Sequence, residues 1–190
     1  MPIVNGKRGP AFQAGDARAA ENPLLASLHT VWVREHNRLA DEISAADSSL
    51  NDEQIYQKAR TTVMALIQNI TYNEFLPALL GDNQLKDYQG YNANTDAGIS
   101  TEFATAAYRF GHSMLSNSIS RMDADGDSLG DVELKDAFFN VNLLKAEGGI
   151  DAYLRGAAQL RAEEIDNKVV DGVRDFLLSN KPSKKPEAVA

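Results

Sequence analysis

The sequence predicts a mostly α-helical protein, and three observations support this prediction. Apolar residues recur every three or four positions from about residue 23 to 46 and from about 52 to 69, which is typical of amphipathic helices. No segment of any length alternates apolar and polar residues as a half-buried strand does. The chain has 190 residues, which suits one domain, and it contains no cysteine, so disulfides and thiolate metal sites are excluded.

The first two predicted helices carry clear end signals. Pro23 suits the first turn of a helix that begins at Asn22 or Pro23 and ends near Ala46. The second helix is expected from about residue 52 to 69, with Asn51 and Asp52 as caps. The apolar stripe of the first helix consists of Leu24, Leu28, Val31, Leu39 and Ile43.

The remaining helices are expected to be shorter. A helix over 72–80 should end at Gly81, and the Asn-, Asp- and Gly-rich residues 82–98 predict a long surface loop. Further helices are expected over 100–115, 150–159 and 167–178, with an irregular stretch over 128–151 that includes a short helix near 134–138. We expect residues 1–10 to be irregular, 11–180 to form the domain and 181–190 to be a disordered tail.

Composition and charge exclude several classes of function. Lysine and arginine number 19 and aspartate and glutamate 27, giving a net charge of −8, which disfavours nucleic acid as a partner. No apolar run approaches the length that would span a membrane. The first ten residues lack the basic and apolar regions of a signal peptide.

Three histidines are the natural candidates for chemistry. His29 and His36 are seven residues apart on one predicted helix, too far to chelate one ion, so we expect them to hydrogen-bond within helix packing. His112 directly follows Gly111, which costs about 1 kcal/mol relative to alanine in a helix and would let a flat group approach. Arg109 lies on the same face and could meet an anionic group. On spacing alone, a helix histidine beside a surface arginine remains the simpler interpretation.

Two further clusters have modest interpretations of their own. Asp16 could cap a short turn on which Arg18 and Glu21 form an exposed ion pair before the first helix. The acidic stretch from Asp123 to Glu133 has acids where a calcium loop has them, but its sixth residue is not glycine and its twelfth is not glutamate. A solvated acidic loop is therefore the preferred interpretation of that stretch.

Several motifs taken together resemble the animal-type haem peroxidases, the group of myeloperoxidase, lactoperoxidase and peroxinectin. They occur in the family's order and at its spacing, and the resemblance covers roughly residues 11–180. The motifs are AGDARAAE at 14–21, HT at 29–30, REHNRLA at 34–40, ITY at 70–72, LP at 76–77, FATAAYRFGHS at 103–113, GGID at 148–151 and LRG at 154–156.

This resemblance implies a multi-helix haem peroxidase-like fold and the reduction of hydrogen peroxide with oxidation of a small electron donor or halide. It implies haem b as cofactor, with His112 as the proximal iron ligand, Arg18 as the distal arginine and Arg109 on the side of a propionate. Glu21 matches a residue that is esterified to the haem in many relatives. It also implies a role in the response to oxidative stress and a secreted location.

The resemblance also implies that this chain is a central, incomplete part of the domain. In the family, the distal histidine and a calcium loop precede the motif at 14–21, and an asparagine partner of the proximal histidine follows the matched region; we expect these parts to be absent here. The missing part of the domain is therefore a candidate partner. The alternative is a non-catalytic haem-binding or interaction remnant.

A third hypothesis, a di-iron carboxylate protein, requires Glu-x-x-His pairs. The residues three positions before the three histidines are Ala26, Val33 and Arg109 and not glutamates, so the sequence disfavours this hypothesis.

Overall fold

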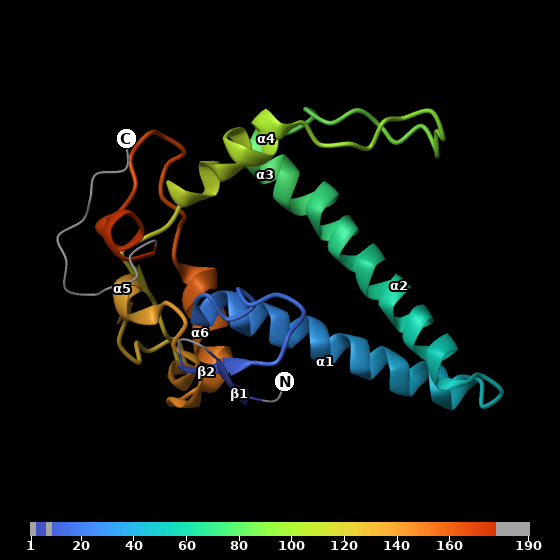
Figure 1. Ribbon diagram of the computed structural model, residues 1–190, viewed down its shortest axis with the longest axis horizontal. Helices are drawn as coiled ribbons and strands as arrows, with labels where there is room; N and C mark the ends of the chain where they lie inside the picture. The colour runs from blue at the N-terminus through green and yellow to red at the C-terminus, as the bar shows by residue number, and fades with distance from the viewer. Residues whose placement is uncertain (1–2, 7–8, 178–190) are drawn as a thin grey trace. The chain divides into compact units, whose positions relative to one another are not determined.

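The computed structural model describes residues 3–6 and 9–177 and divides the chain into two compact units (Figure 1). Unit 1 comprises Met1–Thr30 and Gly98–Ala190, and unit 2 comprises Val31–Ala97. The fold is mostly α-helical, as the sequence predicts. In the described part of the chain, no helix is both long enough and apolar enough to cross a membrane.

Unit 1 begins with a short antiparallel strand pair where the sequence predicts an irregular segment. Strand β1 (Ile3–Gly6) pairs with β2 (Gly9–Phe12), and Ile3 lies opposite Phe12 in the register. Strands of four residues are too short to show a recognisable alternation of polarity. The predicted tail at 181–190 lies outside the described residues.

Helix α1 (Pro23–Ala46) has the bounds that its sequence pattern predicts. Asn22 caps it, because its Oδ1 accepts the Leu25 N–H at 2.9 Å. Pro23, Ala26 and Ser27 are the buried residues of the helix, and all three lie in its first turns within unit 1. The beginning of α1 is therefore packed firmly just after the segment that carries Arg18 and Glu21.

Unit 2 contains the rest of α1, then α2 (Asp52–Ile70), a π-helical turn η1 (Thr71–Phe75) and α3 (Leu76–Leu80). Asn51 and Gln54 form a reciprocal capping box at the start of α2. Gly81 ends α3 with a φ of 92°, and residues 81–97 are described without a helix or strand. Figure 1 shows α1 and α2 leaving the turn at 47–51 in different directions.

The predicted helix over 100–115 is wrong beyond Thr105. Helix α4 (Thr101–Thr105) is capped by Ser100 and stops at Ala106, whose φ and ψ are −124° and −71°. A 3₁₀ helix, η2 (Ala107–His112), follows. Residues 101–109 are exposed, so no packing surface stabilises a longer α-helix, and His112 ends a tighter turn instead.

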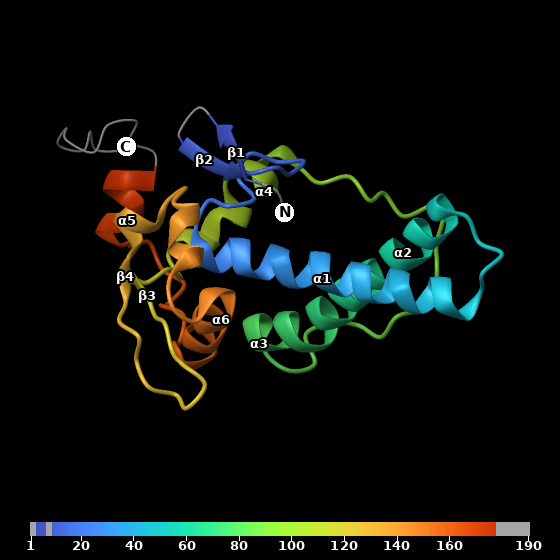
Figure 2. The same ribbon diagram turned by 90° about the horizontal axis from the view of Figure 1, so that it is seen from below.

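The second half of unit 1 encloses the main core. A hairpin of β3 (Ser118–Ile119) and β4 (Val132–Glu133) leads into α5 (Leu134–Ala137), as Figure 2 shows. The 3₁₀ helix η3 (Val141–Lys145) and α6 (Gly149–Gln159) follow. The predicted helix over 167–178 is wrong at its beginning: residues 167–170 are not helical, and the π-helical turn η4 (Gly172–Leu177) covers the described remainder after residue 171. The buried core residues are Ile119, Leu134, Ala137, Tyr153 and Val173.

Candidate functional site

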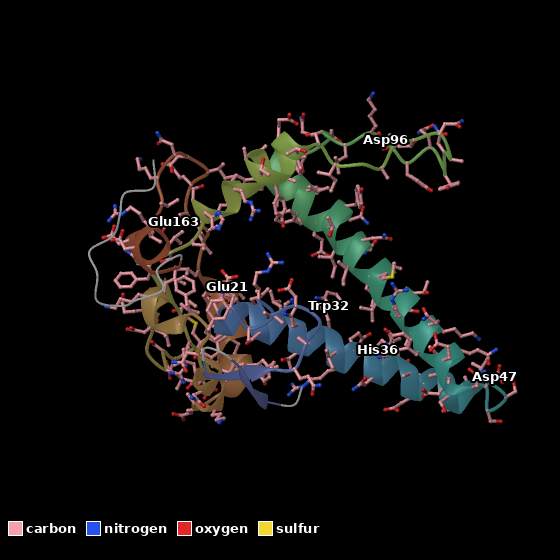
Figure 3. All side chains as sticks on the ribbon, viewed as in Figure 1. Glu21, Trp32, His36, Asp47, Asp96 and Glu163 are labelled. Atoms are coloured by element: carbon pink, nitrogen blue, oxygen red, sulfur yellow. The ribbon has the colours of Figure 1, made fainter. Side chains whose placement is uncertain are left out.

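Arg18 and Glu21 lie on a short loop that several hydrogen bonds hold in place. Within the loop, the Ala19 N–H donates to the Asp16 carbonyl at 3.1 Å and the Glu21 N–H donates to the Arg18 carbonyl at 2.9 Å. From outside it, the Phe139 N–H donates to the Glu21 carbonyl at 2.8 Å. Figure 3 shows Glu21 beside the start of α1. The loop backbone is therefore defined on both sides of Arg18.

The ion pair of this loop differs from the expected one. Arg18 pairs with Asp16 rather than with Glu21: its Nη2 donates to Asp16 Oδ2 at 2.6 Å and its Nε donates to Oδ1 at 3.0 Å. Asp16 also caps the turn, as expected, because Oδ1 accepts the Arg18 backbone N–H at 2.8 Å. An aspartate two residues before an arginine can bind both its backbone and its side chain, whereas the Glu21 carboxylate interacts with the Arg18 side chain only electrostatically.

The charges of this pair stabilise one another. The side-chain hydrogen bond from Arg18 holds the pKa of the Asp16 carboxyl well below its usual range, with a further contribution from the Arg18 backbone N–H. The hydrogen bond to Asp16 in turn raises the pKa of Arg18. Both side chains remain largely exposed, at 70% for Arg18 and 53% for Asp16, so the pair is open to solvent and to ligands.

The geometry of His112 defines the protonation of its ring. Its Nδ1 lies 3.1 Å from the carbonyl oxygen of Arg109, one 3₁₀ turn earlier. A carbonyl only accepts, so Nδ1 must carry the proton, and Nε2 of the neutral ring keeps its lone pair. Residues three apart eclipse one another in a 3₁₀ helix, so the Arg109 and His112 side chains share one face, as the sequence predicts.

Ser113 anchors the end of the η2 turn. It is 7% exposed, and its Oγ donates to the Phe110 carbonyl at 2.9 Å and accepts the Asp166 N–H at 3.4 Å. The Met114 carbonyl accepts the Glu163 N–H at 3.1 Å. Segment 163–166 thus holds the residues that directly follow His112. The only sequence signal for this role is the serine beside the histidine.

The four predicted site residues all belong to unit 1, which brings their two segments into one compact body. Arg18 interacts electrostatically with Tyr108, which lies next to Arg109 in η2. Among the described residues, no hydrogen bond or ion pair joins Arg18 or Glu21 directly to Arg109 or His112.

The other two histidines have different surroundings. His29 Nδ1 lies 2.8 Å from the Ala19 carbonyl oxygen, so His29 hydrogen-bonds within the packing as predicted and also supports the Arg18 loop. For His36, in unit 2, the prediction is wrong in part: its Nδ1 lies 3.4 Å from the neighbouring Asn37 side chain, and its buried Nε2 has no partner among the described residues. Sequence reasoning missed the ion pair between Asp16 and Arg18 and the support that His29 gives to the Arg18 loop.

The acidic stretch from Asp123 to Glu133 covers most of the loop between β3 and β4 and the two residues of β4. The side chain of Asp123 is used internally, since its Oδ1 accepts the N–H groups of Asp125 and Asp127, each at 2.9 Å. Asp131 accepts from the Ser120 hydroxyl at 2.8 Å. Within residues 3–6 and 9–177, no group of three or more histidine, aspartate or glutamate side chains is placed to share a metal ion.

An apolar cavity of about 220 Å³ also lies in unit 1. Leu24, Met114 and Leu160 contribute to its lining, whereas the four predicted site residues do not.

Comparison with known proteins places these features in a family context. The family model described as "Animal haem peroxidase" matches residues 3–190. Hamster (Mesocricetus auratus) lactoperoxidase is 42% identical over 184 residues, which are 92% of this chain and 26% of the relative. Dog (Canis lupus familiaris) thyroid peroxidase is 43% identical over 163 residues, which are 82% of this chain and 17% of the relative.

A solved structure agrees with the sequence matches. Peroxidase A from Dictyostelium discoideum superposes with a TM-score of 0.86 at 30% identity, covering 99% of this chain and 40% of the other. The chain thus spans about a quarter or less of the two mammalian relatives and less than half of the solved one.

Proposed function

Because the chain belongs to the animal haem peroxidase family, we propose that it supplies the proximal ligand and the distal arginine of a haem site. At that site, hydrogen peroxide is reduced while a small electron donor or halide is oxidised. The observation that carries the proposal is the hydrogen bond from His112 Nδ1 to the Arg109 carbonyl, because in the neutral ring it leaves the lone pair on Nε2.

The residues around His112 fit a haem group. An imidazole nitrogen is an ordinary axial ligand of haem iron. A Cβ added at Gly111 would meet nothing within 4 Å, so there is open space beside the ligand. No ion pair engages Arg109 among the described residues, so its guanidinium is available to a haem propionate. We further propose that Glu21 provides the carboxylate for an ester link and that the haem is haem b.

Each residue then has a defined task. Bound haem supplies the redox chemistry that cleaves the oxygen–oxygen bond of peroxide. Arg18 stabilises the negative charge that develops on the peroxide oxygens, and its guanidinium stays protonated at every relevant pH. His112 holds the group in place and donates electron density to it, and the Arg109 carbonyl fixes the orientation of its ring. Proton transfer belongs, in this proposal, to the distal histidine of the family, a position that the resemblance gives to none of the three histidines here.

Unit 2 supports the proposal that the rest of a peroxidase domain is the partner of this chain. Ala59 is the only buried residue of unit 2 in the described structure. Large apolar side chains on the same elements remain 37–52% exposed: Met64, Leu66, Ile67, Ile70, Phe75 and Leu80. A surface of this composition marks a protein interface. The solved relative has more than half of its length beyond the matched region, which is material that could cover such a surface.

The test is a haem titration followed by the Soret band, with His112→Ala and His36→Ala compared with the wild type. We expect saturable, stoichiometric binding that is lost in His112→Ala and retained in His36→Ala, because His36 lies in unit 2. A band that is absent, or that persists in His112→Ala, would contradict the proposal.

An assay of peroxide-dependent donor oxidation then distinguishes a working peroxidase from a non-catalytic remnant. Saturable haem binding with no turnover, alone or with the rest of the domain added, would favour the non-catalytic haem-binding remnant.

A further inference from the structure

We propose that Asp16 is the positioning residue of Arg18: its carboxylate holds the inner edge of the guanidinium and leaves the outer edge to meet a peroxide or an anion. This inference rests on the proposed role of Arg18 in the haem site. The observation behind it is the paired contact of the two side chains on an exposed loop.

The contact uses one defined edge of the guanidinium. Nε donates to Asp16 Oδ1 at 3.0 Å, and Nη2 donates to Oδ2 at 2.6 Å. A guanidinium has five N–H donors in a rigid planar fork, so this side-on pairing occupies two and leaves three. The three are the two protons of Nη1 and the outward proton of Nη2, and one proton of each of these nitrogens lies at the end of the fork. A ligand that approaches Arg18 therefore meets a preset pair of donors.

Asp16 fixes the backbone of Arg18 as well as its side chain. The same Oδ1 accepts the Arg18 N–H at 2.8 Å, and the Asp16 carbonyl accepts the Ala19 N–H at 3.1 Å. One aspartate thus sets both where the Cα of Arg18 lies and where its guanidinium points. The His29 bond to the Ala19 carbonyl secures the following peptide.

The exposure of Arg18 makes this restraint necessary. The side chain is 70% exposed, and Asp16 provides its only ion pair in the described structure. An arginine held by nothing would sample many rotamers, and ordering it on ligand binding would cost conformational free energy. Holding the guanidinium beforehand removes that cost from the binding and reaction steps.

The chain contains a matched control for this arrangement. Asp166 accepts the Lys168 N–H through Oδ1 at 2.8 Å and pairs with Lys168 Nζ through Oδ2 at 3.1 Å. The Asp166–Lys168 pair has the same two-residue spacing and the same cap, but it contains no arginine. The variant Asp166→Asn therefore reports the general effect of removing the carboxylate charge from such a turn.

The first experiment measures how fast Arg18 reacts with phenylglyoxal in the haem-free chain, followed by peptide mass mapping. A guanidinium held by a carboxylate should react slowly despite its exposure. We expect Arg18 to react several-fold faster in Asp16→Asn, and to return toward the wild-type rate in Asp16→Glu, which restores the charge. Asp166→Asn should leave the Arg18 rate unchanged.

Two outcomes would overturn the inference. In one, wild-type Arg18 reacts as fast as Arg34, which is exposed and has no side-chain ion pair in the described structure. In the other, Asp16→Asn leaves the Arg18 rate unchanged. Thermal unfolding of both asparagine variants is measured alongside, because comparable losses of stability would show that the reactivity change is specific to Arg18.

A second arm links the inference to the haem site. In the haem-loaded chain, azide binding is titrated from the Soret shift. Asp16→Asn should weaken azide binding several-fold and leave the haem affinity itself unchanged, whereas equal azide affinity would count against the inference. If His112→Ala does not alter haem binding, the proposed function fails, yet the phenylglyoxal arm still decides whether Asp16 holds Arg18.

Discussion

The ring of His29 donates a 2.8 Å hydrogen bond from Nδ1 to the carbonyl oxygen of Ala19, which follows Arg18 directly in the chain. The bond joins the packed start of α1 to the exposed loop of the predicted site. Because a carbonyl oxygen only accepts, the bond also defines Nδ1 as the protonated nitrogen of the neutral ring. His29 therefore supports the site by a hydrogen bond to the loop backbone and not by contact with a ligand.

Removing this bond should loosen the loop at a modest cost in stability. His29→Ala is expected to lower the free energy of unfolding by about 1 kcal/mol, the usual net value of one partly buried hydrogen bond. Urea denaturation at pH 7 measures the change, and the phenylglyoxal reactivity of Arg18 should rise in the same variant. Unchanged values of both would show that the loop is held without His29.

His36 should behave in the opposite way. Its buried Nε2 has no partner among the described residues, and its ring lies 5.2 Å from the Tyr56 ring, between centroids. His36→Phe keeps an aromatic contact and removes an unsatisfied polar atom, so it should leave stability unchanged or raise it by about 1 kcal/mol. A clear loss on urea denaturation would indicate that water or another group satisfies Nε2.

Gly156 and Gly111 form a matched pair for a substitution test. A Cβ at Gly156 would lie 3.0 Å from the Arg121 backbone nitrogen and closer still to the Ser120 carbonyl group, whereas one at Gly111 meets nothing within 4 Å. Gly156→Ala must push α6 away from the β3 segment and should cost roughly 3 kcal/mol. Gly111→Ala should change stability by less than about 1 kcal/mol. Thermal unfolding of both variants checks the contrast.

The open space at Gly111 also gives a test of the haem proposal. Gly111→Val should leave the folded state intact, because a Cβ at this position meets nothing within 4 Å. It should weaken haem binding, since the added methyl groups would occupy the space beside His112. Parallel circular dichroism and Soret titration separate the two effects. Unaltered haem affinity would place the cofactor away from this face of η2.

Acid should destabilise the protein in a defined range of pH. Hydrogen bonds from neighbouring side chains and backbone N–H groups lower the pKa values of Asp16, Asp47, Asp166 and Asp175 in the folded state. A carboxyl with a lowered folded pKa contributes stability that is present above its unfolded value of about 3.9 and is lost as the pH falls toward the folded value. The contribution of these groups to the urea midpoint should therefore be constant from pH 7 to 5. The midpoint should decrease when the pH is lowered below about 4. Asp16→Asn should show a smaller fall than the wild type.

Local patterns were sufficient for the long helices. The caps of α1 and α2, at Asn22 and Asn51, lie within three residues of the groups they bind. The motif around His112 also placed Arg109 on its face correctly, because both α and 3₁₀ helices bring such residues together. The sequence predicted wrongly that one continuous helix leads to His112, because residues 101–109 lack a packing surface in the fold.

The sequence by itself determined the helical class, the bounds of α1 and α2, and the motifs that relate this chain to the animal haem peroxidases. Only the tertiary structure decided that Arg18 pairs with Asp16, that His29 supports the Arg18 loop, and that Gly156 packs against Ser120. The physical reason is range: capping and periodicity act within a few residues, whereas the bonds from His29 to Ala19 and from Asp166 to Ser113 join positions 10 and 53 residues apart. Such contacts exist only once the intervening chain has packed.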